Sequence, residues 1–133
     1  MQAIILAAGR GTRLGEMTRE TPKSLIRVAG NPIIEHILFS LPSEISEVVL
    51  ATRHLGDKIK VHVGSYFNGL PVKYAHLSEL NGTGGALWGL RDKIKGNKFL
   101  VLNGDDIYHP WELKQCLIHD LAFGLNHTTP PGP

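Results

Sequence analysis

The sequence has only one cysteine, Cys116, so no disulfide can form within the chain. A lone thiol among the residues of an expected helix is typical of a core position in a reducing compartment. No apolar run approaches the ~20 residues that cross a bilayer. The amino-terminal segment also lacks the basic residues and the long apolar stretch of a secretory signal. We therefore expect a soluble, cytoplasmic protein.

A strong excess of charge of one sign is also missing. The 14 Lys and Arg residues are nearly balanced by 12 Asp and Glu residues, which leaves a formal net charge of +2. No cluster of five or more basic residues occurs, so neither nucleic acid nor a membrane surface is indicated as a partner. The seven histidines show no convincing metal-ligand spacing. The sequence leaves the oligomeric state open, including a homo-oligomer.

Apolar strand patterns and helix patterns alternate along the whole chain. Strands are expected at residues 2–8, 47–52, 71–76 and 98–103, with the start of a fifth at 121–125. Helices are expected after an Asn31–Pro32 start, over residues 56–67, after the Gly82–Gly85 cluster, and over residues 110–119. This order predicts an α/β fold: a Rossmann-like, mainly parallel sheet with helices on both faces.

The length of 133 residues suits one compact domain with a single core. We assign residues 1–126 to that domain, which we expect to be incomplete at its carboxyl end. The segment 127–133 is rich in proline and threonine and lacks apolar residues. It is interpreted as a flexible tail or a truncation point.

The first expected strand runs into three glycines, Gly9, Gly11 and Gly15. Ligands of parallel sheets bind at this carboxyl end of the strands. The spacing is one residue longer than the dinucleotide fingerprint G-x-G-x-x-G. The ribose-binding acid of that fingerprint is also missing near the end of the second strand, where Thr52 and Arg53 stand. A nicotinamide-dependent oxidoreductase is therefore disfavoured.

The same loop fails the Walker A pattern, because Lys23 follows proline rather than glycine. A plain glycine turn is the simplest alternative, yet basic side chains are crowded into this loop. Backbone amides at Gly9 and Gly11 can approach a polyphosphate closely. Arg13 can fork onto two phosphate oxygens, and Lys23, stiffened by Pro22, can place a compact charge on the phosphate that reacts.

The stretch "LAAGRGTRLGEMTRETPKSLIRVAGNPIIEHIL" resembles the signature of the sugar-1-phosphate nucleotidyltransferases. The later segments "NGTGGAL" and "LVLNGDDIY" resemble the family's second glycine segment and its metal-binding G-D segment. The resemblance implies a nucleotide-binding Rossmann-like fold. It also implies transfer of a nucleotidyl group from a nucleoside triphosphate to a sugar 1-phosphate, with release of pyrophosphate and with Mg²⁺ as cofactor.

The resemblance also implies roles for residues of the first loop. Ala8 would lie against the base or ribose, and the backbone of Gly9 and Gly11 would line the triphosphate together with Thr12. Arg13 would bind the leaving β and γ phosphates.

Four further roles follow from the resemblance. Lys23 would contact the α-phosphate and stabilise charge during attack. Gly82 would pack close to the nucleobase with Thr83 beside it, and Asp105 would hold the Mg²⁺. Arg13 and Lys23 are therefore the predicted catalytic residues.

Several positions depart from the family pattern. Gly15–Thr18 replaces a P-L-T segment, and Leu77 stands where a base-reading glutamine is frequent. Glu79 could read guanine or be a solvated loop carboxylate. Asp106 is interpreted as a capping residue or a residue behind the metal ligand, because neighbours on a strand face opposite sides.

No acceptor-binding segment is visible after Asn126. The sequence therefore leaves open which base the nucleotide carries and which sugar is the acceptor. It also leaves open whether the short chain is active by itself. Two alternatives stay open beside the sugar enzyme: a non-catalytic nucleotide-binding or regulatory module of the same fold, and a cytidylyltransferase for a phosphate such as phosphocholine.

Overall fold

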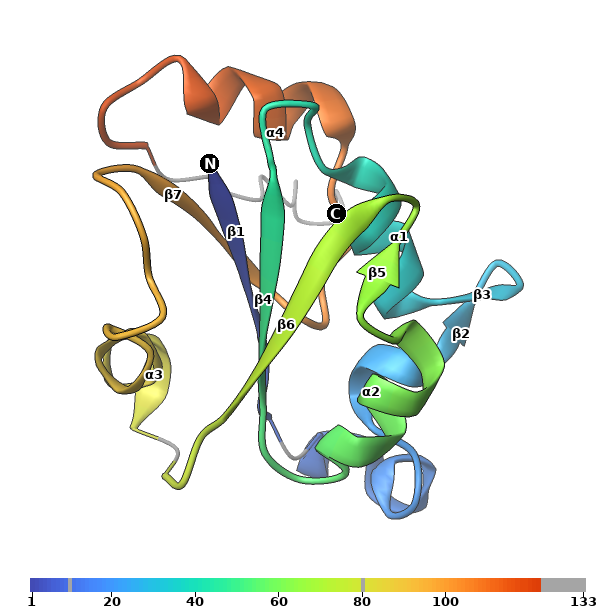
Figure 1. Cartoon of the computed structure of the whole chain (residues 1–133). Coiled ribbons are helices and arrows are strands. Elements are labelled where there is room, and N and C mark those ends of the chain that lie inside the picture. Colours follow the sequence, from blue (N-terminus) through green and yellow to red (C-terminus); the bar gives the residue numbers. More distant parts are fainter. Residues whose placement is uncertain (10, 80, 123–133) are drawn as a thin grey trace, which may run out of the picture.

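The computed structural model describes residues 1–9, 11–79 and 81–122 (Figure 1). Its centre is a five-stranded sheet in the order β5-β6-β4-β1-β7. The strands are β1 (Gln2–Ala7), β4 (Glu47–Thr52), β5 (Tyr66–Phe67), β6 (Leu70–His76) and β7 (Phe99–Asn103). All pairs are parallel except β5–β6, which is antiparallel. The predicted mainly parallel α/β sheet is confirmed.

Four helices flank this sheet: α1 (Ile33–Ser40), α2 (Gly56–Val63), α3 (Gly82–Gly89) and α4 (Pro110–Leu117). In Figure 1, α3 lies on the opposite side of the sheet from α1 and α2. The long loop after β1 contains two 3₁₀ helices, η1 (Thr12–Thr18) and η2 (Lys23–Leu25). It continues into a small antiparallel hairpin of β2 (Arg27–Val28) and β3 (Asn31–Pro32).

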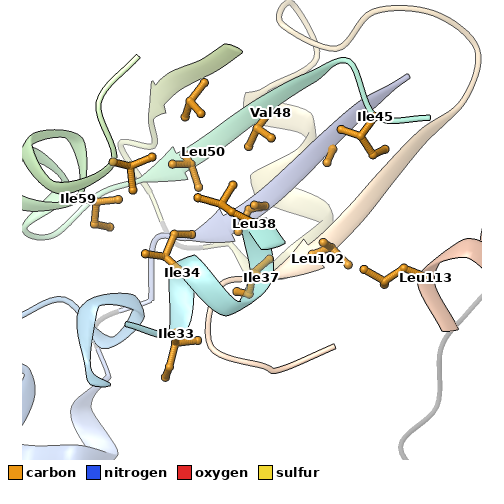
Figure 2. Packing of buried hydrophobic residues seen from close by; sticks show 14 residues of the cluster. Ile33, Ile34, Ile37, Leu38, Ile45, Val48, Leu50, Ile59, Leu102 and Leu113 are labelled. Carbon is orange, nitrogen blue, oxygen red and sulfur yellow. The ribbon is translucent and has the colours of Figure 1, made fainter. Parts of the chain in front are cut away.

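Alternating side chains of the central strands build one core on each face. On β1, Ile5 joins the larger cluster with Ile34 and Ile37 of α1, whereas Ile4 joins the smaller cluster with Leu90 beyond α3. Figure 2 shows the larger cluster, in which α1 packs along the sheet. Each fully buried aliphatic side chain contributes about 1.5–3 kcal/mol. The two faces therefore hold β1 as the central, doubly covered strand.

Helix α1 begins at Ile33, one residue later than the sequence predicts with Asn31 as N-cap and Pro32 as first helical residue. Both residues belong to β3, where Pro32 pairs with Arg27 and Asn31 pairs with Val28. Pro32 has φ −57° and ψ 145°, which is extended backbone. Strand pairing thus takes the two residues that the sequence pattern assigns to the helix start.

Helix α2 ends at Val63, not at residue 67. Gly64 adopts φ 76°, a left-handed value that stops the helix. Phe67 therefore does not lie on the helix: it belongs to β5 and packs edge-on against Phe39, with ring centroids 5.0 Å apart. The predicted turn at Asn68–Gly69 is confirmed, since both residues have positive φ in the β5–β6 hairpin.

Two sequence predictions concern the carboxyl-terminal region. Leu121 and Ala122 lie outside any strand. Residues 123–125 of the predicted fifth strand and the 127–133 tail lie outside the described residues. Cys116 on α4 is partly buried and not a core residue, contrary to the sequence prediction. In the described part of the chain, no helix is long and apolar enough to cross a membrane.

The strand order places a topological switch beside β1. The chain moves from β1 through β4 to β6 on one side and then returns to β7 on the other side of β1. In such sheets the loops that leave two neighbouring strands diverge at the carboxyl edge and open a crevice for ligands. The loops after β1 and β7 meet these conditions, and both carry residues that the sequence singles out.

Candidate functional site

An ion pair joins the loop after β1 to the loop after β7. Lys23 Nζ donates a hydrogen bond to Asp105 Oδ2 at 2.6 Å. The lysine side chain is 35% exposed and the aspartate side chain 42% exposed. The pair is therefore accessible to a ligand at the carboxyl edge of the sheet.

Gly104 brings Asp105 to this edge. Its amide donates to the carbonyl of Leu6 at 2.9 Å, which extends the pairing of β7 with β1. A Cβ at position 104 would lie 2.8 Å from the Ala7 Cα and 2.8 Å from the Leu6 oxygen. Only glycine permits this backbone approach, which sets Asp105 beside the end of β1.

Thr18 fixes the shape of the glycine loop. Its buried hydroxyl donates to the carbonyl of Gly11 at 2.8 Å and lies 3.2 Å from the carbonyl of Gly15. Gly11 adopts φ 63°, and a Cβ there would lie 2.7 Å from Thr18 Cγ2 and 3.4 Å from Lys23 Cβ. Gly11, Thr18 and Lys23 thus pack together. In the sequence, Thr18 is marked only as part of a departure from the family pattern.

The side chains of Thr12 and Arg13 are outside what the structure describes, so their predicted roles stay predictions. Gly9 is exposed, and a Cβ there would meet nothing within 4 Å. Ala8 is 5% exposed and belongs to the smaller core cluster. The methyl group of Ala8 is therefore a core group, and contact with a nucleoside there would fall to the backbone.

The loop after β7 is closed by its own polar contacts. The backbone amide of Asn103 donates a hydrogen bond to Tyr108 Oη at 2.8 Å. The side-chain Nδ2 of Asn103 donates a second one to Asp106 Oδ2 at 3.0 Å. Burial raises the pKa of Tyr108 to about 12. Asp105 and Asp106 thus have separate partners. Neither Asn103 nor Tyr108 was predicted, because a polar residue at a strand end and a tyrosine five residues later form no recognisable motif.

The second glycine segment begins α3. Gly82 adopts φ 69°, and Gly82 and Thr83 are both exposed. Asn81 Nδ2 donates to Glu79 Oε2 at 2.9 Å, so this carboxylate has a local partner. Leu77 is 5% exposed and lies in the core, not at the surface. Within the described ranges, no hydrogen bond or ion pair links Gly82 or Thr83 to Lys23 and Asp105.

The donor set fits a metal held jointly by protein and ligand. The described residues contain no group of three or more His, Cys, Asp and Glu side chains that could enclose a metal ion. Asp105 offers one accessible carboxylate beside a loop suited to phosphate. Mg²⁺ commonly uses one or two carboxylates together with substrate phosphates and water.

Known proteins resemble this chain in sequence and in fold. The chain is 37% identical over 98% of its length to the bifunctional protein GlmU of Methanococcus maripaludis. It is 38% identical over 81% of its length to the D-glycero-alpha-D-manno-heptose 1-phosphate guanylyltransferase of Campylobacter jejuni. A putative glucose-1-phosphate thymidylyltransferase from Bacillus anthracis, solved with a sucrose, superposes on 89% of the chain with a TM-score of 0.77 and 28% identity.

The chain spans only part of each of these proteins. It covers 31% of the GlmU protein, 49% of the guanylyltransferase and 50% of the thymidylyltransferase structure. The family model of the nucleotidyl transferases matches residues 2–123. The protein therefore belongs to the nucleotidyl transferase family.

Proposed function

We propose that this protein transfers a nucleotidyl group from a nucleoside triphosphate to a sugar 1-phosphate and releases pyrophosphate. The observation that carries this proposal is the Lys23–Asp105 ion pair of 2.6 Å at the carboxyl edge of the sheet. Relatives with 37–38% identity include an enzyme whose name states a sugar 1-phosphate guanylyltransferase. The family, the fold and the Lys23–Asp105 ion pair thus all support nucleotidyl transfer as the reaction class.

The reaction needs charge neutralisation and alignment more than a covalent nucleophile. Lys23 supplies a compact positive charge for the α-phosphate. The amides of Gly9 and Gly11, and Arg13, are the groups we assign to the triphosphate. Gly82 and Thr83 are the groups we assign to the nucleoside.

Lys23 and Asp105 carry opposite charges and are paired with each other. Binding of the triphosphate requires Lys23 to exchange the carboxylate for a phosphate oxygen. Asp105 is the residue that would hold Mg²⁺, and this hard cation would lower the negative charge of the phosphates. The pair therefore sets both groups close together at the site where we place the triphosphate.

The test is a pyrophosphate-release assay with the four common nucleoside triphosphates and a panel of sugar 1-phosphates in the presence of Mg²⁺. Binding of each triphosphate is measured in parallel by calorimetry. We expect one triphosphate to bind best, and its binding to weaken at least tenfold in Lys23→Ala. Lys114→Gln is the control because this exposed lysine on α4 has no ion pair in the described part of the chain.

Turnover with one triphosphate and one sugar 1-phosphate would establish the reaction. Triphosphate binding that depends on Lys23, without turnover by any pair, would favour the nucleotide-binding module. Equal binding by wild type and Lys23→Ala would contradict the site itself.

A further inference from the structure

A cavity opens beside Thr18. Its volume is about 840 Å³, and we call it the basic pocket. Besides Gly15 and Glu16, its lining residues are Thr18, Arg19, Arg53, His54, His76 and Ser78. These residues come from η1 and the residue that follows it, the turn after β4, and the end of β6.

The charge of the basic pocket is unbalanced. Arg19 and Arg53 contribute two guanidinium groups, and His54 and His76 contribute two imidazoles, which donate a hydrogen bond even when neutral. The only acid among the lining residues is Glu16. Among the described residues, no hydrogen bond or ion pair engages any of the four basic side chains. Donors of one sign gathered around an open cavity indicate an anionic ligand.

The walls of the basic pocket are held by contacts from outside it. The Leu77 amide donates to the carbonyl of Thr52 at 2.8 Å, which ties the exit of β6 to the end of β4. Lys58 on α2 donates to the carbonyl of Glu20, which ties the turn after β4 to the loop after η1.

The turn that presents Arg53 and His54 is itself constrained. Leu55 adopts φ 58°, a left-handed conformation that a leucine rarely takes. A Cβ at Gly56 would lie 2.7 Å from Thr52 Oγ1. Strained backbone of this kind persists where the surrounding structure fixes it, and it is frequent at ligand sites.

We propose that the basic pocket binds a phosphate group. Arg53 is its main ligand because it is the less exposed of the two arginines and sits on the fixed turn. Arg19 and the two histidines supply further donors. The site is distinct from the Lys23–Asp105 pair, since neither of these two residues lines the pocket. The proposal does not require nucleotidyl transfer.

The test measures binding of inorganic pyrophosphate, used as the probe, to the 133-residue chain. Binding is followed by calorimetry in the absence of metal ions. We expect one saturable site, with pyrophosphate affinity about tenfold lower in Arg53→Gln. The loss should be smaller in Arg53→Lys, which retains the positive charge but not the bidentate guanidinium group. Lys114→Gln removes the same unit of charge far from the pocket and should bind as wild type does. Thermal unfolding checks that every variant is folded.

Three results would overturn the site: no binding at millimolar pyrophosphate, equal binding by wild type and Arg53→Gln, or loss in Lys23→Ala as large as in Arg53→Gln. The last result would place the anion at the nucleotide site instead. A failed turnover assay leaves this measurement unaffected, so the two proposals fail independently.

A competition experiment identifies the source of the phosphate. Displacement of pyrophosphate by a non-hydrolysable nucleoside triphosphate would assign the pocket to the tail of the triphosphate. Simultaneous binding of both would assign it to a separate phosphorylated molecule. Either result supports a phosphate site.

Discussion

Lys23 and Asp105 are separated by 82 positions in the sequence, yet Lys23 Nζ lies 2.6 Å from Asp105 Oδ2. The contact depends on the parallel pairing of β1 with β7, which sets Leu6 opposite Asn103. Two residues beyond that pair, the chain presents Asp105 to the loop after β1. The two side chains to which we assign phosphate and metal binding thus meet at the switch point of the sheet.

Replacing Lys23 by alanine should abolish function with little effect on stability. Both partners are more than a third exposed, and such ion pairs contribute at most ~1 kcal/mol because solvent screens them. Removing a charge that stabilises the transition state lowers kcat by about 10²–10³. Urea unfolding and pyrophosphate release, measured on the same preparations, separate the two effects. Unchanged release by Lys23→Ala would contradict the proposed role.

Gly104→Ala should destabilise the fold and displace Asp105. The new methyl group would lie 2.8 Å from backbone atoms of Leu6 and Ala7, which cannot rotate away. Overpacking of this kind costs about 1–3 kcal/mol. The urea midpoint measures the cost, and triphosphate affinity reports the displacement.

Gly84→Ala is the matched control for that substitution. Gly84 lies within α3, and a Cβ there would meet nothing within 4 Å. Alanine in a helix interior is favoured over glycine by roughly 0.5–1 kcal/mol, so this variant should be as stable as wild type or more stable. Equal midpoints for the two glycine variants would rule out the close contact at Gly104.

Thr18→Val should loosen the glycine loop. Valine keeps the shape of the buried side chain but removes the hydroxyl that donates to the Gly11 carbonyl at 2.8 Å. Loss of a buried hydrogen bond of this kind costs about 1–3 kcal/mol. Triphosphate affinity should fall as well, because Gly11 is no longer held. The exposed Thr21→Val is the control, with a change expected within ±0.5 kcal/mol.

Local patterns in the sequence were sufficient for most of the fold. The apolar runs at residues 2–7 and 47–52 are strands because both faces are buried, which leaves no polar alternation. Asn68–Gly69 is a hairpin turn because both residues tolerate positive φ. The start of α1 was misplaced because tertiary pairing with Arg27–Val28 outcompetes a local helix signal.

The candidate site was less accessible to sequence reasoning. Lys23 and Asp105 were selected by motif resemblance, but their pairing follows from sheet order, which no local pattern encodes. Thr18 and Tyr108 act through single hydrogen bonds inside loops, where no periodicity marks them. Arg53 stood out only as the wrong residue for a ribose-binding site, and His54 only as one of seven histidines without metal-ligand spacing.

Tyr108 should make the protein sensitive to alkaline pH. Burial raises its pKa to about 12, whereas an unfolded tyrosine ionises near pH 10. Between these values the unfolded state has lost the proton that the folded state retains, so the free energy of unfolding falls as pH rises from about 10 towards 12. Urea midpoints measured from pH 8 to 12 should show this decline, and it should be smaller in Tyr108→Phe.

Tyr108→Phe also removes the acceptor of the Asn103 amide, which should cost about 1 kcal/mol at neutral pH. Tyr74→Phe is the control, because burial raises the pKa of Tyr74 too, while its hydroxyl donates to the Gly64 carbonyl far from the loop after β7. Both variants should flatten the alkaline decline, but only Tyr108→Phe should change triphosphate affinity, since only Tyr108 closes the loop that carries Asp105. An alkaline decline of wild-type size in Tyr108→Phe would mean that this hydroxyl titrates normally in the folded protein.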